Sequence, residues 1–186
     1  MTEPLAIQIR PFTAADQEEV RELILSGLEE HWGTRDPLKN PDLDDIDRSY
    51  ADAMFLVACK GNSIVGTGAL VPRSDKAAEI VRMSVAAGRR RQGLGSMILK
   101  ALLRQAEGIG ITRVVLETTA SWHDAVRFYL RHGFEVTHYK DDDVYFALDL
   151  RRSDPCDRTE TEKGSDTNGI RLVISPRRGA RYINDC

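Results

Sequence analysis

A basic, glycine-rich stretch, Arg-Arg-Arg-Gln-Gly-Leu-Gly-Ser at residues 89–96, has the residue types of an anion-binding loop. Gly93 and Gly95 let the backbone approach a ligand closely and tolerate positive φ, and the arginines add positive charge. The alternating run 79–85 predicts a strand before the loop, and apolar residues at helical spacing follow it. The loop therefore leads into a helix N-terminus, where N–H groups lack internal partners and the helix dipole is positive. We predict a pyrophosphate site here.

Two other kinds of phosphate loop do not fit this stretch. A P-loop requires Gly-Lys-Ser/Thr after a four-residue spacer, and the sequence contains no such run. A dinucleotide-binding loop requires a third glycine at the position of Ile98. The pattern that remains is Arg90-x-x-Gly93-x-Gly95, and a basic surface turn without a ligand stays an alternative interpretation.

The elements that position this loop follow from hydrophobic periodicity and turn residues. A capping-box-like Thr-Ala-Ala-Asp at 13–16 opens the first helix, and Gly133 occupies the position expected just after the last one. In chain order we expect a strand at 7–10, a helix from 13 to about 33, a short helix at 44–53, strands at 55–59, 63–71 and 79–85, a long helix from 97 to before Gly108, a strand at 113–118, a helix from Ser121, and strands at 134–139 and 144–150.

Residues 151–186 differ in character from the residues before them. They hold scattered Ser, Thr and Gly and neither Phe nor Trp, which predicts a disordered tail after a domain over 1–150. Only 170–174 has the pattern of a strand.

Composition narrows the class of protein. One domain is expected for 186 residues, of which 41% are apolar and 30% charged. No apolar run reaches membrane-spanning length and the start shows no secretory signal, so we expect no membrane association. Three cysteines and four histidines without metal-ligand spacing predict a reduced, cytoplasmic setting and no metal. The net charge of −3 and the pI near 5.8 argue against nucleic acid as a partner.

The order of elements and two motifs resemble the GNAT superfamily of N-acetyltransferases over about residues 6–150. The loop is similar to that family's Gln/Arg-x-x-Gly-x-Gly/Ala, and Ala-x-x-Phe-Tyr-x-x-x-Gly-Phe at residues 125–134 is similar to its second motif. The resemblance implies an α/β fold in which helices flank a central, mixed, mostly antiparallel sheet with splayed central strands. It also implies acetyl-CoA as cosubstrate.

The resemblance implies roles for individual residues. Tyr129 would protonate the departing thiolate. Glu79 lies eleven residues before Arg90, as in histone-type members, and would act as base; by alternation it is expected to share a face with Val81, Met83 and Val85. Glu117 is a reserve base, and a base acting through water is a further alternative. The implied cofactor-binding residues are Met83, Ser84 and Val85 beside the pantetheine arm, and Arg90, Arg91, Gln92, Gly93, Leu94, Gly95 and Ser96 around the pyrophosphate.

The acceptor site is less defined by the sequence. The family's Asn before the second motif is replaced by Trp122, and Ser121 is expected to cap the helix instead. Candidate acceptor-binding residues are His31, Trp32, Glu117 and Trp122. The acidic set Asp42, Asp44, Asp45 and Asp47 either attracts a cationic amine or is solvated helix-start charge.

We therefore predict an N-acetyltransferase that moves an acetyl group from acetyl-CoA to a primary amine by direct attack in a ternary complex. The amine belongs to a small molecule or a peptide, and the protein is a monomer or a homodimer. A non-catalytic acyl-CoA-binding module and an interaction protein that uses its tail remain alternatives.

Overall fold

A computed structural model of the 186-residue chain describes residues 6–34, 39–150 and 171–172. In chain order its elements are β1 (Ile7–Pro11), the 3-10 turn η1 (Ala14–Asp16), α1 (Gln17–Trp32), η3 (Pro41–Leu43), α2 (Ile46–Ser49), β2 (Met54–Lys60), β3 (Ser63–Pro72), β4 (Ala77–Val85), η4 (Ala87–Arg89), α3 (Leu94–Gly108), β5 (Arg113–Thr119), α4 (His123–Arg131), β6 (Glu135–Lys140), β7 (Asp143–Asp149) and β8 (Arg171–Leu172). The predicted order up to residue 150 is confirmed. The largest difference in extent is α2, a single turn where a helix over 44–53 was expected.

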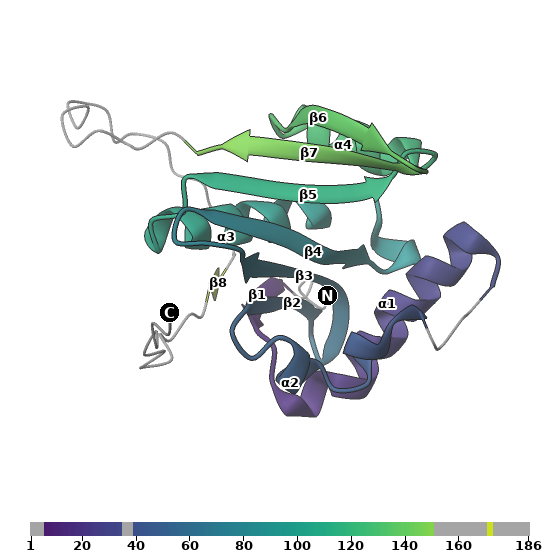
Figure 1. Cartoon of the computed structure of the whole chain (residues 1–186). Coiled ribbons are helices and arrows are strands. Elements are labelled where there is room, and N and C mark those ends of the chain that lie inside the picture. The colour runs from purple at the N-terminus through teal and green to yellow at the C-terminus, as the bar shows by residue number, and fades with distance from the viewer. Residues whose placement is uncertain (1–5, 35–38, 151–170, 173–186) are drawn as a thin grey trace.

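The strands form one sheet in the order β6-β7-β5-β4-β3-β2-β1-β8 (Figure 1). Neighbours are antiparallel except for β4–β5 and β1–β8, which are parallel. The mixed, mostly antiparallel sheet predicted from the sequence is therefore confirmed. Strand β8 places Arg171 and Leu172 beside Gln8 and Ile9 of β1. The remainder of 151–186 lies outside the described residues, so the domain boundary and the disordered tail stay predictions.

Local sequence signals set the ends of α1 and the end of α4. The Thr13 N–H and hydroxyl both donate to Asp16 Oδ2, at 2.8 and 2.9 Å, so the predicted capping interaction precedes α1. Gly33 and Gly133 follow α1 and α4 with left-handed φ of 71° and 84°. Glycine adopts this conformation without steric cost, which explains why both helices end there.

The start of α4 differs from its prediction. Ser121 does not cap the helix, because the Trp122 N–H closes a turn on the Thr119 carbonyl at 2.9 Å and His123 is the first helical residue. The N-cap position therefore falls on Trp122, whose side chain makes no capping hydrogen bond.

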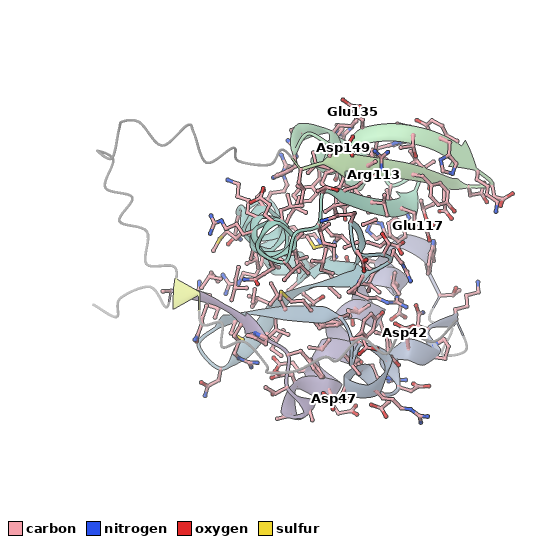
Figure 2. All side chains as sticks on the ribbon, turned by 60° about the vertical axis from the view of Figure 1, so that its left-hand side comes forward. Asp42, Asp47, Arg113, Glu117, Glu135 and Asp149 are labelled. Atoms are coloured by element: carbon pink, nitrogen blue, oxygen red, sulfur yellow. The ribbon has the colours of Figure 1, made fainter. Side chains whose placement is uncertain are left out.

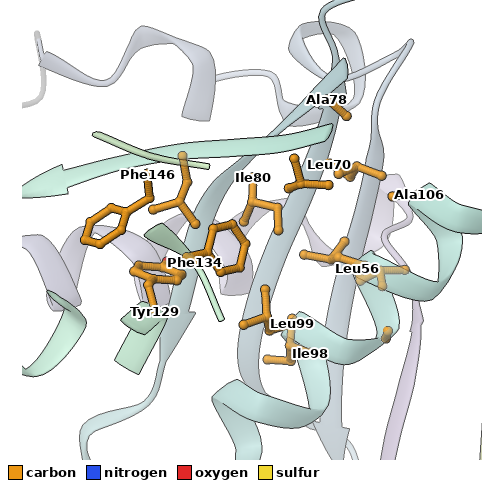
Figure 3. Close-up of a cluster of buried hydrophobic side chains, with 14 of the residues drawn as sticks. Leu56, Leu70, Ala78, Ile80, Ile98, Leu99, Ala106, Tyr129, Phe134 and Phe146 are labelled. Carbon is orange, nitrogen blue, oxygen red and sulfur yellow. The ribbon is translucent and has the colours of Figure 1, made fainter. Parts of the chain in front are cut away.

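Two apolar clusters lie on opposite faces of the sheet. Helices α3 and α4 cover one face, and α1 with α2 covers the other (Figure 1). Strand β2 is buried on both faces, so Leu56 and Ala58 pack toward α3 while Phe55 and Val57 pack toward α1. Figure 3 shows the cluster on the α3 side, which includes Tyr129 of α4. A strand buried on both faces needs a continuous apolar run, and β2 has one.

Glycines in β3 let α3 approach the sheet closely. A Cβ at Gly66 would lie 2.7 Å from Ile98 Cδ1, and one at Gly68 would lie 2.6 Å from Met83 Sδ. Real Cβ atoms essentially never come this close to other atoms. Any residue other than glycine at these two positions would therefore force the neighbouring side chains to move. The close contact fixes the N-terminal half of α3, and with it the loop 89–96, against β3 and β4.

Strand β4 contains a bulge that the sequence pattern does not reveal. Thr67 pairs with Ser84 and Ala69 with Val81, so Gly68 alone opposes both Arg82 and Met83. Arg82 adopts a left-handed φ of 55°, and its carbonyl accepts a hydrogen bond from the buried Thr67 hydroxyl at 2.8 Å. One extra residue reverses which face each later side chain occupies.

The bulge corrects one prediction about the site. Plain alternation placed Glu79, Val81, Met83 and Val85 on one face. In the structure Val81 packs toward α1, whereas Met83 and Val85 pack with the α3-side cluster. The Ser84 side chain lies on the α1 side instead: a Cβ added to Gly27 of α1 would be 3.1 Å from Ser84 Oγ.

The central strands separate, as the resemblance to the family implied. Strands β4 and β5 pair only from Ala77 to Glu79 and from Arg113 to Val115. Beyond these residues they diverge toward their C-terminal ends (Figure 1). The edge of β4 that faces β5 therefore has no strand partner from Ile80 to Val85 among the described residues.

Candidate active site

A cavity of about 520 Å³ occupies the opening between β4 and β5. Its walls come from α1, from β4 around the bulge, from the C-terminal end of β5 and from α4. It contains ten of the residues proposed from the sequence: His31, Trp32, Glu79, Met83, Ser84, Val85, Arg90, Glu117, Trp122 and Tyr129. Residues from five separate parts of the chain thus meet in one place.

The glycine-rich loop lies next to this cavity rather than in its wall. Arg91, Gln92, Gly93, Leu94, Gly95 and Ser96 are not among the lining residues. Gly93 has a left-handed φ of 81° and caps α3, and the first intrahelical bond runs from the Met97 N–H to the Gly93 carbonyl at 3.0 Å. The backbone N–H groups of residues 94–96 therefore belong to the open first turn, which is suited to an anion.

Gly95 leaves room beside that turn. The nearest atoms to a Cβ there belong to Phe128 and Val85, at 3.5 Å or more, so no neighbour among the described residues requires glycine at this position. The position is therefore open to a ligand that approaches the helix end.

Arg90 connects the loop to α1. Its Nη1 lies 2.5 Å from Glu30 Oε2, and its Nε donates to the Val85 carbonyl at 3.1 Å. The guanidinium therefore spans the side of the cavity between α1 and the end of β4. An anion at the helix N-terminus would compete with Glu30 for this charge.

Tyr129 places a phenol at the cavity. The side chain is 8% exposed, and its ring packs against Phe128, Phe134 and Phe146. The hydroxyl has no hydrogen-bond partner in the described part of the chain. No side-chain polar atom there that is shielded from solvent lacks a partner, so the hydroxyl oxygen must open into the cavity that Tyr129 lines. Burial raises the pKa of Tyr129 above the ordinary value of 10 for a phenol, because the charged form loses hydration.

The two candidate bases have different surroundings. The Glu79 side chain is 19% exposed, and Arg73 donates to its Oε2 through Nε, at 2.6 Å, and through Nη2. Glu117 lies opposite Tyr145 on β7 and accepts a hydrogen bond from it, which raises the pKa of Tyr145. Both carboxylates line the cavity, so the structure keeps both as candidates.

Three aromatic side chains join α1 to the start of α4. His31 stacks on Trp122 with ring centroids 4.2 Å apart, and Trp32 contacts the same indole at 5.4 Å. Three of the four residues predicted for the acceptor side are therefore brought together at one wall, and the fourth, Glu117, lines the cavity from β5. Trp32 is 48% exposed, so this wall also meets solvent.

A polar cluster at the bulge was not foreseen from the sequence. Arg82 donates to both Asp42 oxygens, at 2.5 and 2.9 Å, and to Asn40 Oδ1 at 2.9 Å, while the Tyr50 hydroxyl donates to Asp42 at 2.6 Å. Burial and this last bond raise the pKa of Tyr50 to about 12. Arg82 is a charged residue in the middle of the strand-like run 79–85, and that was the available signal.

The same cluster decides between the two interpretations of the acidic segment. Of its four carboxylates only Asp42 lines the cavity, and Arg82 already neutralises it. Asp44 pairs with Arg21, and Asp45 caps α2 through the Arg48 N–H at 3.0 Å. Three of the four carboxylates, those of Asp42, Asp44 and Asp45, are therefore engaged in contacts within the protein.

Within residues 6–34, 39–150 and 171–172 no group of three His, Cys, Asp or Glu side chains is arranged to hold a metal ion. None of the helices over the same residues combines the length and the apolar character needed to cross a membrane.

Comparison with known proteins identifies relatives of this arrangement. The model of the acetyltransferase (GNAT) family matches residues 18–134. N-acetyltransferase 8F1 of Rattus norvegicus is 37% identical over 103 residues, which are 52% of this chain and 47% of that protein. The chain thus spans about half the length of the curated relatives it matches.

Solved structures show the same fold. An acetyltransferase of the GNAT family from Staphylococcus aureus Mu50 aligns with a TM-score of 0.72 and 25% identity, over 78% of this chain and all of that one. The PaiA N-acetyltransferase from Thermoplasma acidophilum, solved in complex with coenzyme A, aligns with a TM-score of 0.70 and 19% identity, over 78% of this chain and 99% of that one.

Proposed function

Because the chain belongs to the acetyltransferase (GNAT) family, we propose that it transfers an acetyl group from acetyl-CoA to a primary amine, with both substrates bound together. The observation that carries this proposal is the hydroxyl of the buried Tyr129, which has no partner among the described residues and opens into the cavity between the separated strands. A purely structural tyrosine would be expected to satisfy its hydroxyl within the fold.

The residues present fit acetyl-CoA. The open first turn of α3, with Gly93 and Gly95, would hold the pyrophosphate, and Arg91 would add charge beside it. The unpaired edge of β4 at Met83–Val85 would pair with the amides of the pantetheine arm, as an added strand would. Bound in this way, acetyl-CoA supplies the thioester that the amine attacks.

The chain contributes to the transfer in three ways. Holding both substrates in one cavity supplies much of the rate gain through proximity. A backbone N–H at residues 83–85 polarises the carbonyl as charge develops on its oxygen. The Tyr129 hydroxyl donates a hydrogen bond to the departing sulfur. Since burial places the pKa of Tyr129 above that of a thiol, near 8.5, the hydrogen bond stabilises the thiolate without full loss of the phenol proton.

The amine must lose a proton before it attacks, because alkylamines have pKa values near 10. Glu79 is the proposed acceptor of that proton, directly or through water, and its contact with Arg73 holds the carboxylate in place at the cavity. Glu117 is the second candidate, since it lines the same cavity from β5.

One experiment tests the proposal. Calorimetry with acetyl-CoA is expected to show binding, and a panel of primary amines is then assayed for release of CoA thiol. Binding without thiol release from any amine would make the protein a non-catalytic acyl-CoA-binding module. Absence of binding by a folded sample would reject the site.

A further inference from the structure

The charges at the cavity do not balance. Six charged residues line it besides His31, and four of them are engaged in pairs: Asp42 with Arg82, Glu79 with Arg73, and Arg90 with Glu30. Glu117 and Asp143 are the other two, and neither forms an ion pair with any described residue. The cavity therefore has two carboxylates without an ion pair among the described residues, both on the β5–β7 side, and Glu117 accepts a hydrogen bond from Tyr145.

Register places these two carboxylates on one face of the sheet. Glu117 lies opposite Tyr145, and Asp143 lies opposite Thr119, so the two are diagonal neighbours on antiparallel strands. Such neighbours are about 7 Å apart at Cβ. Lys140 lies opposite Asp143 on β6 but makes no ion pair with it.

The two positions differ in their distance from β4. Pairing between β4 and β5 ends at Val115, so Glu117 lies two residues into the opening, whereas Asp143 lies one strand further out. Figure 2 shows Glu117 apart from the Arg113–Asp149 pair at the other end of β5. Tyr129 packs its ring on Phe146 of β7 and opens its unpartnered hydroxyl into the same cavity. The Tyr129 hydroxyl, which has no partner among the described residues, and two carboxylates without an ion pair thus line the same cavity.

We propose that the acceptor carries two amine nitrogens about 7 Å apart, with the reacting amine beside Glu117 and a second, protonated nitrogen held by Asp143. This inference rests on the proposed acetyltransferase function. In the transfer, a C–N bond forms at the acetyl carbon and the C–S bond breaks. The reacting nitrogen loses one proton before it attacks and a second as the amide forms; one of these protons ends on the sulfur, which leaves as the thiol, and the other passes to solvent. The distal nitrogen stays protonated, so its ion pair with Asp143 persists from substrate to product.

Two matched pairs of amines test this. The first is 1,5-diaminopentane against 1-aminopentane, and the second is lysine amide against norleucine amide. In each pair the chain length is equal and only the second charge differs. We expect kcat/KM, measured by release of CoA thiol, to favour the doubly charged member by roughly 5- to 10-fold, the effect of one partly shielded ion pair. Preference in the first pair alone indicates a free diamine, and preference in both indicates an amino-acid or peptide acceptor; either supports the inference.

Asp143→Asn should reduce this preference to nearly 1. Asp149→Asn is the matched control, because it removes the same charge from the same strand. Six residues separate the two positions, or about 20 Å, which exceeds the range of unscreened charge effects in physiological salt. Equal use of both members by the wild type, or equal loss of preference in both variants, would overturn the inference.

Binding provides a second measurement that does not depend on turnover. Calorimetry of 1,5-diaminopentane with the CoA-loaded protein should show weaker binding for Asp143→Asn than for Asp149→Asn. Asp143-dependent binding without acetylation of any amine would support the inference about the site and refute the proposed reaction. Acetylation of amines without preference for the doubly charged member would support the proposed reaction and refute the inference about the acceptor site.

Discussion

Tyr129→Phe removes one hydroxyl and retains a ring that contacts three phenylalanines. In the protein alone that hydroxyl has no partner in the described residues, so no hydrogen bond is lost. Burying an unpaired hydroxyl costs roughly 1–3 kcal/mol, and contact with the cavity relieves part of that cost. We therefore expect the melting temperature to stay unchanged or to rise by a few degrees.

Turnover should respond in the opposite direction. A hydrogen bond to a charged group contributes roughly 1.5–3 kcal/mol, so loss of the bond to the departing thiolate should lower kcat by about 10- to 150-fold. The dissociation constant of acetyl-CoA should change by less than about twofold, because the bond strengthens only as the sulfur leaves. Stopped assays of thiol release at saturating substrates and calorimetry give the two quantities separately.

A control and two contrary outcomes complete this test. Tyr139→Phe deletes the same hydroxyl at a side chain that is 67% exposed and outside the cavity lining, so activity should be unchanged. Full kcat in Tyr129→Phe would refute the role of the hydroxyl in sulfur departure. Weaker acetyl-CoA binding with unchanged kcat would make Tyr129 a binding residue instead.

Three further predictions address the loop, the base and the tail. Gly95→Val should abolish acetyl-CoA binding measured by calorimetry, whereas Gly108→Val, at the other end of the same helix where nothing lies within 4 Å of an added Cβ, should bind normally. Equal binding by both variants would show that the pyrophosphate does not bind at the first turn of α3. Glu79→Gln should lower kcat/KM by roughly 100-fold or more at neutral pH, and a larger loss in Glu117→Gln would transfer the role of base to β5. A chain that ends at Leu150 should have a melting temperature within about 2 °C of that of the full chain, because the entropy cost of ordering the two-residue strand β8 offsets its few hydrogen bonds. A melting temperature lower by several degrees would show that the tail stabilises the domain.

The sequence by itself determined the features that depend on neighbouring residues. The capping interaction at Thr13–Asp16, the glycine ends of α1 and α4 and the strand–loop–helix at 79–96 all use contacts within a few positions. The order of these elements together with two motifs carried the resemblance to the family, and that resemblance implied the mixed sheet with separated central strands. These features depend on residues only a few positions apart, so they can be recognised in a single sequence.

Tertiary structure alone decided the features that join distant residues. The bulge at Arg82 depends on Asp42 and Tyr50, which bind its side chain from the α2 region, and on Thr67 of β3. Alternation assumes an unbroken strand, so it assigned Met83 to the wrong face. Which carboxylates at the cavity are neutralised likewise depends on partners up to forty residues away, and no local pattern shows them. The resemblance of two motifs to the family proposed Tyr129 and the glycine loop as site residues, and the separation of β4 from β5 opens the cavity that Tyr129 lines.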